Sequence, residues 1–264
     1  MLGDAATQEA AAVRSGFRFG DRGTQTSRTI MLAELRALLA TTSLSSTRSD
    51  YLAAIVQDNA LGKKTESTRR LTAKRLGELY GLDRGILLFR VLRHLWDADK
   101  AGQPMLACLC ANARDPLLRI TSAAILPVPQ GESVSAADIA QIVATEAPGR
   151  FNEDTLQKIG RNAASSWTQS GHLKGRIRKV RVRPVVTPES MAYALLLGHL
   201  TGARGSLLFD SHWVRLLDLT GTEIDALAFQ TSRRGLIDYR RLNTVVEISF
   251  SGLISPQDLE AVCE

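Results

Sequence analysis

Apolar positions along the chain recur mainly at intervals of three and four residues, which is the spacing of one face of an α-helix. Thr26 or Ser27 is placed to cap a first helix, and its apolar stripe consists of Ile30, Leu32, Leu35, Leu38 and Leu39. Residues 1–25 show no such period, and we expect them to form a flexible, loose N-terminal arm that becomes ordered near Phe17 and Phe19. The pattern as a whole predicts a mainly α-helical protein.

A basic helix follows a short turn in the next part of the chain. The pattern predicts a helix over about 50–60, a turn in which Gly62 is a C-terminal cap, and a helix from Thr65 or Ser67 to Tyr80. The apolar face of this last helix comprises Leu71, Leu76, Leu79 and Tyr80. Helix, glycine-containing turn and basic helix is the order of a helix-turn-helix. Three apolar helices, expected at 86–96, 104–111 and 116–126, complete an N-terminal helical domain over 26–126.

Residues 127–132, with two prolines and a glycine, predict a linker before a second unit over 133–264. Ser135 is placed to cap a helix over 136–145, and Asn152 or the region of Asp154 is expected to open a second helix that ends at Gly171. Basic and β-branched residues then alternate over 173–186, which is typical of a β-ribbon. This is the order of a winged helix. The last third of the chain repeats the order more weakly, ending in a strand over 244–250 whose hairpin is not basic.

The net charge of +6 is concentrated in one part of the chain. Residues 150–183 contain nine basic and two acidic residues, which sum to +7, so all other residues together sum to −1. A local positive excess is typical of a surface that contacts a polyanion.

Two basic segments are therefore the candidate phosphate-binding sites. The first, over 63–75, holds one acid and several hydroxyl side chains; its cations are Lys63, Lys64, Arg69, Arg70, Lys74 and Arg75. The second covers a helix and the ribbon; its cations are Lys158, Arg161, Lys174, Arg176, Arg178, Lys179, Arg181 and Arg183. The alternatives are a solvated helix face for the first segment and a charged, protected edge strand for the second. Aromatic residues make up only 5% of the chain and do not alternate with these cations, which favours double-stranded over single-stranded nucleic acid.

Catalytic motifs are absent from the sequence, including the P-loop, the nucleophile elbow and the paired histidines of zinc proteases. Cys108 and Cys110 lie in an apolar run without a second ligand pair, so we expect small buried residues in a reducing cytoplasm and no zinc site. No apolar run approaches the ~20 residues of a membrane span. We therefore expect a non-catalytic protein without cofactor or metal.

Three groups of residues resemble, in order and spacing over roughly residues 17–250, the BrxA family of bacteriophage-resistance (BREX) systems. They are DNAL at 58–61 followed by KKTESTRR at 63–70, RDPLLR at 114–119, and FNEDTL at 151–156 continuing through Trp167 to the basic ribbon. The resemblance implies a helical, DNA-binding, non-catalytic protein with helix-turn-helix character and some likeness to the antitermination factor NusB. Its implied partners are double-stranded DNA and other BREX components, among them a methyltransferase and ATPases.

Two other functions fit parts of the sequence. A winged-helix transcription regulator accounts for everything except the resemblance, and would bind a defined palindrome as a dimer. An RNA-binding or scaffold role is suggested by the likeness to NusB.

Overall fold

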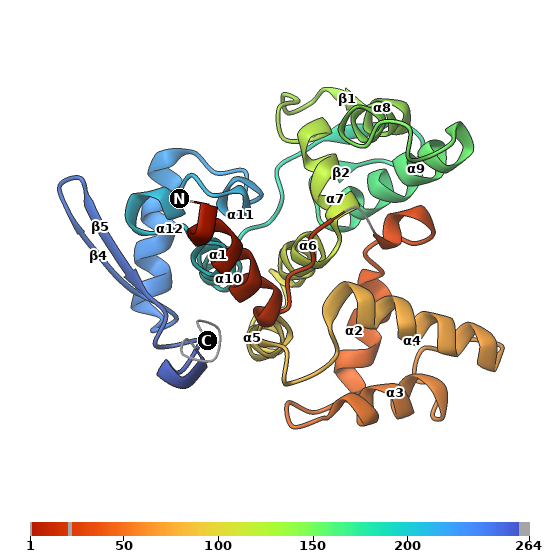
Figure 1. The fold of residues 1–264 in the computed structure, drawn as a ribbon, viewed down its shortest axis with the longest axis horizontal. Coiled ribbons are helices and arrows are strands. Elements are labelled where there is room, and N and C mark those ends of the chain that lie inside the picture. Colours follow the sequence, from red (N-terminus) through yellow and green to blue (C-terminus); the bar gives the residue numbers. More distant parts are fainter. Residues whose placement is uncertain (1, 21–22, 259–264) are drawn as a thin grey trace.

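The computed structural model describes residues 2–20 and 23–258, which form a mainly helical protein with two small antiparallel sheets (Figure 1). The prediction of a mainly α-helical fold is confirmed. The helices are α1 Leu2–Ser15, η1 Thr24–Thr26, α2 Leu32–Thr41, α3 Arg48–Val56, α4 Glu66–Tyr80, α5 Leu87–Trp96, α6 Gln103–Arg114, α7 Pro116–Thr121, η2 Ser122–Ala124, α8 Ala136–Glu146, α9 Glu153–Gln169, α10 Pro188–Leu200, η3 Gly205–Leu208, α11 His212–Arg215 and α12 Gly221–Arg233. The strands are β1 Ser133–Val134, β2 Leu173–Lys174, β3 Lys179–Arg181, β4 Asp238–Leu242 and β5 Val245–Ser249.

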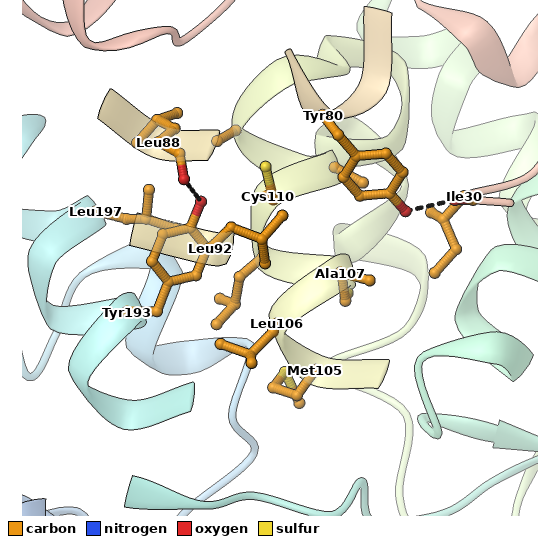
Figure 2. Packing of buried hydrophobic residues seen from close by; sticks show 14 of the residues in the cluster. Ile30, Tyr80, Leu88, Leu92, Met105, Leu106, Ala107, Cys110, Tyr193 and Leu197 are labelled. Carbon is orange, nitrogen blue, oxygen red and sulfur yellow. Dashed lines mark hydrogen bonds between the residues drawn. The ribbon is translucent and has the colours of Figure 1, made fainter. Parts of the chain in front are cut away.

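Helices α5, α6 and α10 form the centre of the molecule, because most residues of each are buried and most of those buried residues are apolar. Figure 2 shows this packing, in which Tyr193 of α10 donates its hydroxyl to the backbone oxygen of Leu88 at 2.9 Å. Tyr80 of α4 likewise donates to the backbone oxygen of Ile30, so both buried phenols are satisfied. Three peripheral groups surround this centre: α2–α4, α7–α9 with the first sheet, and α11–α12 with the second (Figure 1).

Residues 2–15, expected to belong to a loose arm, form helix α1 instead. The segment is rich in alanine, the strongest helix former, and it lies beside α10. Ala12 and Phe17 are buried, and the ring of Phe17 meets Trp213 edge-on at 5.4 Å. This corrects the expectation for that segment, and it confirms that the chain is ordered near Phe17.

Helix α2 begins later than Thr26 or Ser27, so the predicted cap is wrong. The carboxylate of Asp115 binds the amide and hydroxyl of Thr24 at 2.7 and 2.6 Å, which holds residues 24–26 in a separate short turn. Side chains of α9 then satisfy backbone amides at the start of α2, with Ser166 accepting from Ile30 at 3.1 Å and Gln169 accepting from Leu32 at 3.0 Å. A distant helix therefore replaces the local cap.

Helix α4 follows its predicted boundaries closely, whereas α3 covers Arg48–Val56 and so begins and ends earlier than the expected 50–60. Thr47 and Asp50 form a capping box at the start of α3, and the hydroxyl of Thr65 accepts the amide of Thr68 at the start of α4. Leu71, predicted on the apolar face of α4, is 41% exposed, because the buried face of α4 runs through Thr72, Ala73, Leu76, Leu79 and Tyr80 instead.

Helices α8 and α9 pack tightly because Gly160 faces α8. A β-carbon at Gly160 would lie 2.1 Å from the backbone oxygen of Ala136. Ser135 and Asn152 cap these two helices as predicted. The strands form a sheet in the order β1-β3-β2, all antiparallel, with Val134 opposite Lys179 and Leu173 opposite Arg181.

One cluster of buried side chains includes residues from both sides of the 127–132 segment, from Ala12 to Ile254. The division into two units at this segment stays a prediction. The expected strand near residues 244–250 is confirmed as β5, which forms a hairpin with β4.

Candidate nucleic-acid interface

Helix α9 presents one polar face to solvent. Ile159, Ala163 and Trp167 are buried on its other side, and the indole nitrogen of Trp167 donates to the hydroxyl of Thr121 at 2.8 Å. Lys158 and Arg161 are therefore held on the exposed face, one turn apart.

The β2–β3 hairpin follows α9 directly and carries exposed cations at its tip. Gly175 has a φ of +110°, and a β-carbon there would lie 2.1 Å from the backbone oxygen of Arg178, so the tight turn requires glycine. Lys174, Arg176 and Arg178 are exposed around this turn. Arg178 donates from Nε to the hydroxyl of Ser133 on β1 at 2.7 Å, which orients its guanidinium group.

We use the name basic surface for Lys158, Arg161, Lys174, Arg176 and Arg178. None of these five forms an ion pair with an acid in the part of the chain that the structure describes. The helical rise places the end of α9, and so the base of the hairpin, roughly 16 Å beyond Lys158, the length of about five base pairs. The basic surface thus combines two cations on α9 with three on the hairpin that follows it.

Arg181 does not belong to this surface, which corrects its assignment as a candidate DNA contact. Its side chain is 1% exposed and pairs with Asp218 at 2.8 Å. It also donates to the backbone oxygens of Ile125, His172 and Val182. The side chain of Arg181 therefore points into the protein, and a phosphate would have to displace all of these partners.

Two further ribbon cations are also engaged within the protein. Arg183 pairs with Glu223 and donates to the backbone oxygen of Asp218 at 3.1 Å. Lys179 donates to the backbone oxygen of Gly175 at 2.9 Å, an exposed contact that a phosphate oxygen can replace. Arg183 therefore joins the hairpin to the C-terminal region.

Most cations of the 63–75 segment have partners inside the molecule. Lys63 pairs with Glu34 of α2 at 3.0 Å, and Arg75 pairs with Glu78 at 2.8 Å. These two acids lie outside the segment, which is why the low acid count over 63–75 was misleading.

Of the remaining four cations of that segment, two contact groups within the protein and two do not. Arg70 pairs with Glu66 at 2.6 Å, and Arg69 donates to the backbone oxygen of Val56 at 2.8 Å. Lys64 and Lys74 are exposed and have no partner among the described residues. The structure thus leaves two of the six cations on α4 and its turn available to a ligand.

The 114–119 motif that carries part of the family resemblance has a structural role. Arg114 donates to the backbone oxygens of Gly16, Gly77 and Glu78. Arg119 donates to that of Arg18 at 2.9 Å. These buried guanidinium groups, together with Asp115, fasten the N-terminal segment to α4 and α7.

Burial suppresses the ionisation of Cys108, Cys110 and His172. Desolvation raises the pKa of Cys108 to about 12 and that of Cys110 to about 11, so both stay as thiols. Desolvation also lowers the pKa of His172 to about 3. Across residues 2–20 and 23–258, no three His, Cys, Asp or Glu side chains gather into a group that could hold a metal ion. Within the same residues no helix has the length and apolar character needed to cross a membrane.

Two residues near these surfaces carry no signal in the sequence pattern. Ser133 lies on β1, a two-residue strand too short to show a period, and it orients Arg178. Arg48, at the start of α3, is an exposed cation that no local charge cluster marks.

Neither protein-family models nor curated proteins give a match to this sequence.

Proposed function

We propose that this protein binds double-stranded DNA through the basic surface on α9 and the β2–β3 hairpin. The observation that carries the proposal is that all five of these side chains are exposed and free of acidic partners among the described residues, whereas Arg181 and Arg183 nearby are paired. Cations whose charge is not already offset by an acid within the protein are the ones able to neutralise phosphates.

The order of elements supports a winged-helix-like unit. Helix α7, strand β1, helices α8 and α9, and strands β2 and β3 follow one another, and the sheet order is β1-β3-β2. In a winged helix the second of the paired helices enters the major groove, and the hairpin lies along the backbone or in the minor groove. Lys158 and Arg161 then contact DNA from the helix, and Lys174, Arg176 and Arg178 from the wing.

Lys64 extends the proposal to the turn before α4. It is exposed, and the order α3, turn, α4 is consistent with the predicted helix-turn-helix. The four engaged cations of the segment are outside the proposed contact set.

The cellular setting that we propose is a BREX phage-defence system, in which the protein is a non-catalytic accessory subunit. This part rests on the resemblance of the 58–70, 114–119 and 151–173 segments. Copurification with a neighbouring methyltransferase or ATPase tests it, and a gene neighbourhood without either contradicts it.

Fluorescence anisotropy with matched duplex DNA, single-stranded DNA and RNA at two salt concentrations tests DNA binding. The variant Lys158→Ala/Arg161→Ala/Lys174→Ala/Arg176→Ala removes four cations of the basic surface. The control Lys100→Ala/Arg215→Ala/Arg233→Ala/Arg240→Ala removes the same charge from exposed positions elsewhere.

We expect duplex affinity to fall steeply with salt, and the first variant to lower the magnitude of the slope of log K against log salt by up to about 3.6, or about 0.9 for each of the four cations. The control keeps the wild-type slope. Equal losses in both variants mean that only net charge matters and contradict the assigned surface. Preference for RNA contradicts the duplex proposal and favours the NusB-like alternative. Tight dimeric binding to one palindrome favours the transcription regulator.

A further inference from the structure

An open groove of about 840 Å³ runs between α3 and α4, on the N-terminal part of the molecule. Helix α4 lines it with positions 70, 73, 74, 77, 78 and 81, and α3 with positions 48, 49, 52, 53 and 56. Both sets recur at helical spacing, so each helix turns one continuous stripe toward the groove. The stripe on α4 covers three turns, or roughly 16 Å.

The floor of this groove is apolar. Leu52 is 42% exposed, although it lies in the middle of α3, whose residues Tyr51, Ala54 and Ile55 are buried. Ala53, Val56, Ala73 and Leu82 continue the floor. At Gly77 an added β-carbon would meet nothing within 4 Å, so the wall of α4 is open at its centre. A floor of this kind accepts apolar side chains and offers no donors to phosphates.

The rim of the groove is basic. Five of its lining residues are cationic and Glu78 alone is acidic, which gives the lining a net charge of +4. Glu78 is itself neutralised by Arg75 at 2.8 Å. Arg48 and Lys74 stand on opposite helices, are exposed, and have no acidic partner among the described residues. A ligand that fits must therefore combine an apolar stripe with negative charge at its edges.

We propose that this groove is the docking site for an amphipathic α-helix of a partner protein, with leucine-like side chains on one face and acidic residues beside them. Such a helix of about 12–16 residues matches the length of the groove. Its apolar face covers Leu52 and the surface around Gly77, which is the helix-in-groove mode of recognition. Its carboxylates meet Arg48 and Lys74. This inference is independent of the proposed DNA surface on α9, which lies on other elements.

The test uses the full chain and a fluorescein-labelled peptide of about 16 residues, with leucine at positions i, i+3, i+4 and i+7 and glutamate on the flanks. A peptide of the same composition in scrambled order is the control ligand. The variant Gly77→Trp fills the groove, and Gly77→Ala is its matched control because the site is open and the added group is small. Arg48→Glu reverses the charge of one rim. Duplex DNA binding and sedimentation velocity are measured on the same samples.

We expect the amphipathic peptide to bind the wild type, and the scrambled peptide to bind at least about tenfold more weakly. Gly77→Trp lowers peptide affinity by about tenfold or more while duplex affinity stays at the wild-type value. Gly77→Ala retains peptide binding, and Arg48→Glu weakens it most at low salt. If the α9 variants lose DNA binding but still bind the peptide, the docking proposal is supported independently of the DNA-binding proposal.

Three results overturn it. Equal binding of both peptides shows that the groove attracts only net charge. Unchanged binding to Gly77→Trp places the peptide elsewhere. Competition by duplex DNA for the peptide, or a dimer that Gly77→Trp dissociates, shows that nucleic acid or a second copy of this chain occupies the groove instead.

Discussion

The guanidinium group of Arg181, on strand β3, lies 2.8 Å from the carboxylate of Asp218, which precedes α12. Arg183 reaches the same loop, donating to the backbone oxygen of Asp218 at 3.1 Å. Two cations of the basic ribbon are thus directed at the protein rather than at solvent. The hairpin is joined to the C-terminal region through them, and the ribbon divides into structural and free cations.

Replacing Arg181 with alanine is expected to destabilise the protein by roughly 2–3 kcal/mol, because it removes a buried ion pair and donors to three backbone oxygens. Asp218 keeps partial access to water, which limits the cost. Urea unfolding measures the change as a lower midpoint. Arg176→Ala is the control and changes the free energy of unfolding by no more than about 0.5 kcal/mol, because that side chain is exposed. An unchanged midpoint for Arg181→Ala together with lost DNA binding would reverse our assignment of this residue.

Gly77 and Gly160 both lie inside helices, yet alanine should have opposite effects at the two positions. At Gly77 the added methyl group meets nothing, so Gly77→Ala stabilises the protein by about 0.5–1 kcal/mol through helix propensity. At Gly160 the methyl group would lie 2.1 Å from the backbone oxygen of Ala136, so Gly160→Ala separates α8 from α9 and destabilises. Thermal or urea unfolding of the two variants checks the signs. Two stabilised variants would mean that α8 and α9 do not pack as closely as described.

The free energy of unfolding should decrease below pH 6.5 because of His172. Desolvation lowers its pKa from 6.5 to about 3. Between these two pH values His172 is protonated in the unfolded chain but neutral in the folded protein. The contribution of this group is complete above pH 6.5 and is lost as the pH falls toward 3, at up to about 1.4 kcal/mol per pH unit. Urea midpoints at several pH values measure it.

The variant His172→Gln cannot titrate and supplies the control for that slope. The ring of His172 contacts the backbone oxygen of Leu216 and the hydroxyl of Ser170, both at 2.8 Å, so glutamine is expected to lower stability at neutral pH as well. The decisive quantity is the slope of the free energy of unfolding against pH, which should be shallower in the variant. Parallel slopes would show that His172 is accessible to protons in the folded state.

The two buried thiols should react with a thiol reagent only after unfolding. Burial raises the pKa of Cys108 to about 12 and that of Cys110 to about 11, so the reactive thiolate is scarce and covered. A variant with Cys263 changed to serine isolates these two groups for the measurement. Stoichiometric labelling of that variant under native conditions would mean that α6 opens readily.

Local patterns in the sequence determined most of the helices and several of their ends. Ser135, Asn152 and Thr65 cap α8, α9 and α4 as expected, because a cap depends only on residues within one turn. Helix α1 and the start of α2 were missed, since their stability comes from packing on α10 and from side chains of α9.

The sequence alone also determined that positive charge is concentrated over 150–183, since that is a sum over neighbours. Only the tertiary structure decided which of those cations are free. Lys63 pairs with an acid 29 positions away in the sequence, and Arg183 pairs with one 40 positions away. Local composition does not reveal partners at such separations. Pairing depends on which surfaces the core brings together, and burial on which side of a strand faces it. The basic segments were therefore visible in the sequence, but the division of their side chains between structure and solvent was settled by folding.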